Sequence, residues 1–180
     1  MEKLQFKKGQ LIAYGSNGVC VVDEIKEMSL LPDMPAEMYY ILHTVRDEAS
    51  KVFVPVDNTG LVSRMRNIMN EEQVEHMLKT TDLEDITWNN DRRARSDEFH
   101  SIIVEGVSGR LLSMICCIHR RKEHLSDEGK NLPVTDSNAL KTAEKLLEDE
   151  IACVMHMGEN EVCEYIRKTI DSRENTYYTI

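Results

Sequence analysis

Hydrophobic and polar residues alternate with a period of two over roughly the first 60 residues of the chain. Four segments carry this pattern or are rich in β-branched and aromatic residues: 10–16, 18–25, 37–45 and 50–57. A two-residue period is typical of strands that bury one face. Between the first two segments, Asn17-Gly18 predicts a tight turn because glycine tolerates positive φ. We expect four or five short strands in a small, strongly bent sheet or barrel.

The last of these segments is predicted to lie at an edge of the sheet or to end a strand. Its three valines, at positions 52, 54 and 56, alternate with Phe53 and Pro55. Proline has no N–H to donate to a ladder, so a central position is unfavourable for it. The alternation also predicts that Phe53 points away from the face that the valines form.

From about residue 69 the apolar residues repeat at spacings of three and four, which is the helical period. Asn70 followed by two glutamates is typical of a helix start. The later helices are predicted to begin at Ser96, at Ser108, and at Thr135 or Asp136. They are predicted to end at Gly106, Gly129 and Gly158, respectively. We therefore expect an α+β chain with a β module at 1–66, an all-α module at 67–170 and a flexible tail at 171–180.

The composition is that of a globular protein, with 41% apolar and 30% charged residues. No apolar run approaches the roughly 20 residues that span a bilayer, and the first ten residues lack a signal peptide's apolar core. The five cysteines are irregularly spaced, which disfavours a disulfide framework. We expect a monomer in the reducing cytoplasm, without a membrane association.

Positive charge is local in this chain, whose net charge is −10. The segment 88–95 has three arginines against one aspartate and includes Trp88, the only tryptophan, and 120–123 has two arginines and a lysine against one glutamate. In contrast, 144–164 has seven acids against Lys145. An acidic protein of this kind is not a general nucleic-acid binder, which would show a basic face.

Two other kinds of chemistry find little support. Two cysteines and two histidines cluster on one predicted helix, at Cys116, Cys117, His119 and His124. A structural zinc site needs four converging ligands, and adjacent residues on a helix point about 100° apart, so buried thiols are the preferred interpretation. No phosphate loop and no nucleophile signature occurs. We expect no metal, no cofactor and no enzymatic activity.

Several segments together resemble the CarD/CdnL family of bacterial transcription regulators, over roughly residues 5–168. The family's opening is matched by "FKKGQLIAYGSNGVCVVDEI", its later strands by "YYILHT" and "VFVPVDN", and the end of the module by Arg66. "ITWNNDRRAR" is similar to the tryptophan-plus-arginine segment, although Arg92 lies four residues after Trp88 and some members have basic residues closer. "LPVTDSNALKTAEKLLEDEIA" is similar to a helix near the end.

The resemblance implies an N-terminal SH3/Tudor-like barrel that binds the RNA polymerase β subunit, as in the transcription-repair coupling factor. It also implies a helical module whose tryptophan wedges into the minor groove of promoter DNA at the upstream edge of the melted bubble and stabilises the open complex. The implied polymerase contacts are Met28, Phe53 and Pro55. The candidate DNA contacts are Trp88, Arg92, Arg93, Arg95, Arg120, Arg121 and Lys122, and the acidic segment 144–164 should face away from DNA.

Alternatives remain open at this point. Trp88 could be a packing residue, although Ile86 is its only apolar neighbour in the sequence. Helical spacing puts Arg92 and Arg95 on one side, where they could bind DNA or form a solvated face. A different class of protein is a Tudor-type adaptor, in which an aromatic cage binds a methylated cation. That cage would comprise Tyr14, Tyr39, Tyr40 and Phe53. A small enzyme with an unrecognised site is a third class.

Overall fold

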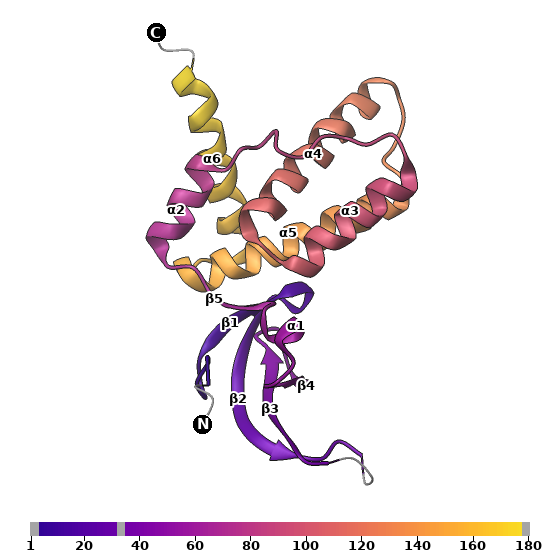
Figure 1. The fold of residues 1–180 in the computed structure, drawn as a ribbon. Coiled ribbons are helices and arrows are strands. Elements are labelled where there is room, and N and C mark those ends of the chain that lie inside the picture. Colours follow the sequence, from indigo (N-terminus) through magenta and orange to yellow (C-terminus); the bar gives the residue numbers. More distant parts are fainter. Residues whose placement is uncertain (1–3, 32–34, 178–180) are drawn as a thin grey trace. The chain divides into compact units, whose positions relative to one another are not determined.

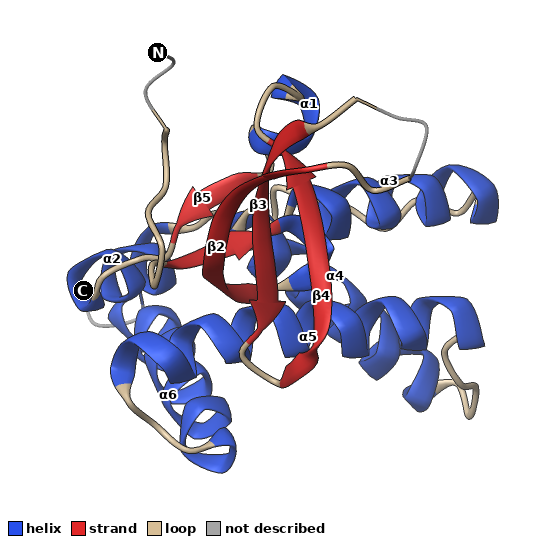
Figure 2. Ribbon diagram, turned by 90° about the horizontal axis from the view of Figure 1, so that it is seen from below, coloured by secondary structure: helices blue, strands red, loops and turns tan. Residues whose placement is uncertain are grey.

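The structure, a computed structural model, describes residues 4–31 and 35–177. It consists of two compact units, Met1–Ile68 and Met69–Ile180. In the described residues the strands belong to the first unit and the long helices to the second (Figures 1 and 2). The predicted small β domain followed by a helical domain is therefore confirmed.

The first unit is built on a single antiparallel sheet with the strand order β4-β3-β2-β1-β5. Its elements are β1 (Leu11–Tyr14), β2 (Val19–Met28), β3 (Glu37–Thr44), β4 (Asp47–Pro55), the short helix α1 (Thr59–Val62) and β5 (Met65–Asn67). The strands curve strongly along their length (Figure 2), and a register shift interrupts β2 between Val22 and Glu24. Among the described residues no ladder joins β4 to β5, so closure into a barrel stays a prediction.

The period-two pattern explains the core of this unit. On β4, Val54 is completely buried whereas its neighbour Phe53 is 39% exposed. Phe6 covers the sheet and meets Tyr40 edge to face, with 5.9 Å between the ring centroids. The predicted turn differs in detail, because Gly15–Asn17 form a 3₁₀ turn and Gly18 follows it with φ of 70°. Only glycine adopts such a φ at low cost.

The described part of the second unit, residues 69–177, contains five helices: α2 (Glu71–Thr80), α3 (Arg92–Glu105), α4 (Ser108–Asp127), α5 (Val134–Met155) and α6 (Glu159–Tyr177). Asn70 starts α2 as predicted, in a capping box with Gln73. Helix α3 begins before the predicted Ser96, because the Asp91 carboxylate accepts a hydrogen bond of 2.8 Å from the Ala94 N–H. Helix α4 ends before Gly129, as predicted, and α5 ends at His156 with φ of 53° rather than at Gly158.

The last helix, α6, continues through Tyr177 and so extends into the segment 171–180, for which the sequence predicts a flexible tail. The Arg173 guanidinium donates to the carbonyls of Leu78, at 2.9 Å, and Thr81, at 2.7 Å. These are carbonyls at the C-terminal end of α2 that have no helical partner of their own. Residues 178–180 lie outside the described residues.

Candidate nucleic-acid interface

Trp88 lies in the irregular connection that joins α2 to α3. Its indole is half-buried and packs against a cluster of buried residues that includes Ile86 and Phe99. The Phe99 ring meets the indole edge to face, with the centroids 6.3 Å apart. Ile86 is the apolar neighbour of Trp88 in the sequence, and Phe99 reaches the indole in space from the second turn of α3. Trp88 is both a packing residue and a partly exposed one.

Arg95 occupies a buried position beneath this indole. Its side chain is 5% exposed and that of Asp136 is 2% exposed. Two parallel hydrogen bonds join them, from Nε at 3.1 Å and from Nη2 at 2.8 Å. Nη1 donates to the backbone carbonyl of Asn89 at 2.6 Å, and the guanidinium carbon lies 4.1 Å from the centre of the Trp88 ring.

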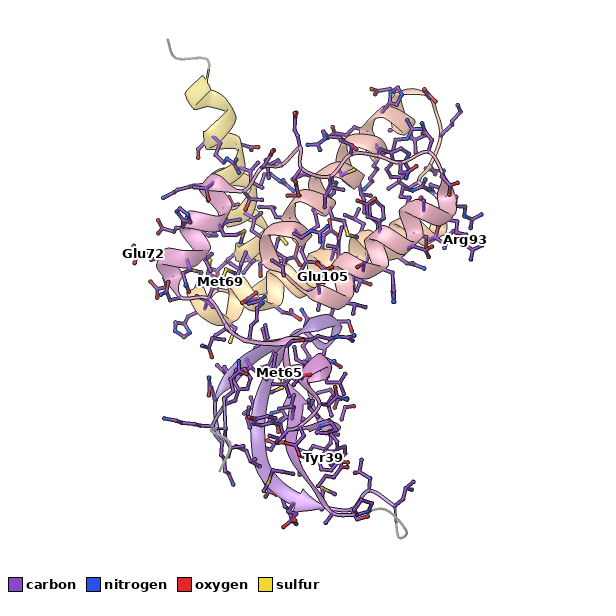
Figure 3. All side chains as sticks on the ribbon, in the orientation of Figure 1. Tyr39, Met65, Met69, Glu72, Arg93 and Glu105 are labelled. Carbon is purple, nitrogen blue, oxygen red and sulfur yellow. The ribbon has the colours of Figure 1, made fainter. Side chains whose placement is uncertain are left out.

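These contacts correct the expectation that Arg92 and Arg95 share an exposed face. Arg95, Phe99 and Ile102 form the buried stripe of α3, so the helical spacing points Arg95 into the unit. Its guanidinium could reach a phosphate only by leaving Asp136 as a buried, unpaired carboxylate. Arg92 and Arg93 remain on the exposed side, and Figure 3 shows Arg93 pointing away from the helices near the start of α3.

An open hollow of about 370 Å³ lies beside Trp88. It is lined by Glu84, Ile86, Thr87, Trp88, Cys117, Arg120, Arg121 and His124. The guanidinium carbon of Arg121 lies 5.5 Å from the centre of the indole ring, and its buried Nε has no hydrogen-bond partner among the described residues. Arg120 donates to the Leu83 carbonyl at 2.9 Å, which fixes the connection to α4. Lys122 is exposed on the same helix.

The lining of the hollow therefore combines apolar and cationic side chains. Ile86, Cys117 and the indole provide the apolar surface, while Arg120 and Arg121 provide charge. Such a lining can bind a planar apolar group that carries an adjacent negative charge. The indole offers a surface for stacking, and the two arginines offer donors for a phosphate. Glu84 is the one acid that lines the hollow.

Much of the acidic segment 144–164 takes part in bonds within the helical unit. Glu150 is 2% exposed and accepts from the Ser108 hydroxyl at 2.6 Å and from the Met69 N–H at 3.1 Å. Ser108 thus binds Glu150 instead of capping α4, whose N-cap is Val107. Glu144 is paired with His119 at 2.8 Å.

The four residues considered for zinc do not converge. Cys117 is buried, and that burial raises the pKa of its thiol, whereas His119 faces Glu144 on α5. His124 pairs with Glu128 one turn further along α4, at 3.3 Å. Within residues 4–31 and 35–177 no group of three or more histidines, cysteines or acids is arranged to hold a metal ion.

The candidate polymerase contacts lie together on the sheet. The register pairs Phe53 with Ile41, Pro55 with Tyr39 and Met28 with Glu37. Because residues paired across a ladder share a face, as do alternate residues along a strand, Met28, Phe53 and Pro55 lie on one face of the sheet. Phe53 and Pro55 belong to β4, which is an edge strand as predicted. Further exposed apolar residues in this unit, which sequence reasoning missed, are Leu30, Leu31 and Met38.

An open aromatic cage is not assembled on this sheet. Tyr14, Tyr39 and Tyr40 are 7%, 7% and 1% exposed, and Tyr14 and Tyr40 belong to the core cluster of the unit. Phe53 is the only one of the four cage candidates that is well exposed. A methylated cation needs several aromatic faces around an accessible space, and these residues do not offer it.

Residues 6–68 of the chain match the family model of the CarD-like/TRCF RID domain. The N-terminal unit is a CarD-like RID domain. The match begins at Phe6, whose ring packs on Tyr40, and ends at Ile68, the last residue of the first unit. The RID domain implies an RNA polymerase as a partner of this protein. The search of curated proteins gave no match to the chain.

The helical unit lies outside the match to the RID domain, so its site rests on geometry. Among the described residues, no helix combines the length and the hydrophobicity that crossing a membrane requires. Sequence reasoning found Trp88 and the basic residues of α4 but missed Phe99 and Asp136. A signal for Phe99 was present, because Arg95, Phe99 and Ile102 follow the spacing of one helix face. Asp136 lies on another helix, and no local pattern connects it to Arg95.

Proposed function

We propose that this protein regulates transcription by acting on the open complex of bacterial RNA polymerase. Its RID domain binds the polymerase β subunit, and its helical unit contacts promoter DNA at the upstream edge of the melted bubble. Contact by Trp88 in the minor groove slows the closing of the bubble. Both partners are cytoplasmic, and the protein acts there as a monomer.

The observation that carries the DNA contact is the placement of Trp88 at an open hollow that two arginines also line. Minor-groove proteins insert apolar side chains between base steps at a cost of a few kcal/mol, which is smallest where the duplex is already opening. Arg120 and Arg121 at the hollow and the exposed Arg92 and Arg93 can approach the flanking phosphates. Arg95 is not among these contacts, because Asp136 already binds it.

The net charge of −10 requires that the polymerase bring the protein to DNA. Four phosphate contacts give a weak and salt-dependent attraction, with a dissociation constant in the non-specific range near 10⁻⁴ M or weaker. A domain bound to the polymerase raises the local DNA concentration to about the millimolar range. The RID domain therefore supplies recruitment, and the helical unit supplies the contact.

The test measures the lifetime of open complexes formed by purified bacterial RNA polymerase on a promoter fragment after addition of a competitor. The full chain should lengthen this lifetime. Trp88→Ala should abolish most of the effect while its affinity for the polymerase stays unchanged, since that affinity belongs to the RID domain. Val134→Ala is the matched control, because Val134 is a 75% exposed apolar residue of the same unit.

Two results would contradict the proposal. One is an unchanged lifetime when Trp88→Ala is saturating on the polymerase. The other is tight binding of the wild-type protein to bare duplex at physiological salt, which would remove the need for recruitment. Replacing both Arg92 and Arg93 with alanine should also make DNA binding less dependent on salt. The slope of the logarithm of the binding constant against the logarithm of the salt concentration should decrease in magnitude by roughly 2 if each arginine neutralises one phosphate.

A further inference from the structure

The buried ion pair between Arg95 and Asp136 is costly for a purely structural contact. Both side chains are at least 95% buried, and burying two charges removes favourable hydration that their mutual attraction often only offsets. Well-packed apolar residues at such positions are frequently as stabilising. The geometry around Arg95 indicates what the pair contributes in addition.

The Arg95 guanidinium contacts Trp88 and the residue after it at the same time. It lies 4.1 Å from the centre of the indole ring, and it donates to the carbonyl of Asn89 at 2.6 Å. One group thus holds both the ring of Trp88 and the backbone beside it. The connection that carries Trp88 has no regular secondary structure from residue 85 to residue 91. Backbone hydrogen bonds of a helix or strand therefore do not fix its conformation there, and the side chain of Arg95 helps to fix it instead.

Asp136 determines where this guanidinium lies. The two parallel hydrogen bonds to its carboxylate, of 3.1 and 2.8 Å, fix the plane of the guanidinium as well as its position. Asp136 lies in the first turn of α5, so its backbone position is set by a long helix. Phe99, one turn after Arg95 on α3, also contacts the indole, in an edge-to-face arrangement.

We propose that Arg95 and Asp136 are positioning residues that hold the Trp88 indole in the orientation in which it contacts DNA. The inference rests on the proposed function of Trp88. Arg95 contacts no nucleic acid itself; it stacks on the indole, and Asp136 orients Arg95. Holding the indole before DNA arrives removes the ordering cost that a free side chain would pay on binding.

Two variants of the full chain test this role. Arg95→Lys keeps the positive charge but cannot form two parallel bonds to Asp136 together with the bond to Asn89. The double variant Arg95→Leu/Asp136→Leu removes both charges without leaving one unpaired, so it should remain folded. Arg110→Lys is the matched control, because Arg110 forms an exposed ion pair with Glu105, at 2.8 Å, in the same unit.

Trp88 is the only tryptophan, so its fluorescence reports on the indole in the free protein. At a temperature where circular dichroism shows each variant to be folded, both test variants should emit at longer wavelength and be quenched more strongly by acrylamide. The open-complex lifetime, at saturating occupancy of the polymerase, should fall about three- to tenfold, as expected for the loss of one cation–π contact. Arg110→Lys should match wild type in both measurements.

The results separate failure of this role from failure of the proposed function. Folded variants with wild-type emission and quenching, and only a lower melting temperature, would show that the pair is merely structural and would overturn the inference. Displacement of the indole without a shorter lifetime would overturn it too. If Trp88→Ala itself leaves the lifetime unchanged, the proposed function fails, and the positioning role fails with it.

Discussion

The RID domain and the helical unit each contain an ion network, and the two networks differ in their exposure to water. On the sheet, the Asp23 carboxylate accepts hydrogen bonds from His43, at 2.6 Å, and from Lys51. The side chain of Asp23 is 23% exposed, that of His43 is 15% exposed and that of Lys51 is 42% exposed. In the helical unit, the side chains of Arg95 and Asp136 are 5% and 2% exposed. The first network links strands β2, β3 and β4, and the second links helices α3 and α5.

The difference shows how the two units depend on charge. Water competes with the network of the sheet, so it stabilises the domain by less than about 1 kcal/mol. Water does not reach the pair in the helices, and losing one partner leaves a charge without compensation. The RID domain can therefore lose its ion network and keep its binding surface, whereas the helical unit cannot lose half of its pair and keep Trp88 in place.

Asp136→Ala should have the largest effect. It leaves the Arg95 guanidinium buried without its carboxylate, which costs about 3–5 kcal/mol. For a unit of this size the melting temperature should fall by roughly 10–20 °C. Thermal melting followed by circular dichroism measures the change. The double variant Arg95→Leu/Asp136→Leu should melt close to wild type, and a similar melting temperature for the single variant would show that the pair is not buried in solution.

Trp88→Ala should destabilise the helical unit by an intermediate amount. A fully buried tryptophan would cost about 3–5 kcal/mol on replacement by alanine, but this indole is half-buried, so we expect about 2 kcal/mol. The edge-to-face contact of the indole with Phe99 contributes to this cost. Urea unfolding compares the variant with Val134→Ala, which should be unchanged. A cost as large as that of a core tryptophan would contradict an exposed role for the indole.

Phe53→Ala should weaken polymerase binding without destabilising the RID domain. An exposed aromatic at the centre of a contact commonly accounts for about a tenfold change in affinity, whereas the 39% exposed ring adds little to folding. Binding of the full chain to the polymerase β subunit measures the effect. Val45→Ala, at a 41% exposed position beyond the end of β3, is the control, and equal binding by both variants would place the contact elsewhere on the sheet.

The sequence predicted what depends on local pattern and missed what depends on pairing between distant elements. The alternation around Phe53 and the capping signal at Asn70 each act within a few residues, and both predictions are confirmed. Arg95 was expected on a face shared with Arg92, but its spacing from Phe99 and Ile102 puts it on the buried face of α3. Its partner Asp136 is 41 residues away, so only the packing of α3 against α5 brings the two together. The contacts of Trp88 with DNA and of Phe53 with the polymerase stay predictions.

Asp23→Asn should give the smallest effect, and that effect should depend on pH. The hydrogen bond from Lys51 lowers the pKa of Asp23, burial partly opposes this shift, and His43 adds to the lowering. A carboxylate with a lowered pKa stabilises the folded state at pH values above its unfolded pKa of about 3.9, and this contribution is lost as the pH falls through the folded pKa. At neutral pH the variant should lose less than about 1 kcal/mol.

Hydrogen exchange of amides in β2, β3 and β4 resolves this small change, because it reports on the RID domain separately from the helices. Protection in Asp23→Asn should be lower than in wild type at neutral pH. The difference should shrink as the pH falls through the lowered pKa of the folded-state Asp23 carboxyl, because that carboxyl then becomes protonated and neutral like the amide. Asp57→Asn, at an exposed position after β4, should match wild type throughout. A difference that persists unchanged at low pH would show that the loss comes from shape or hydrogen bonding and not from the charge of Asp23.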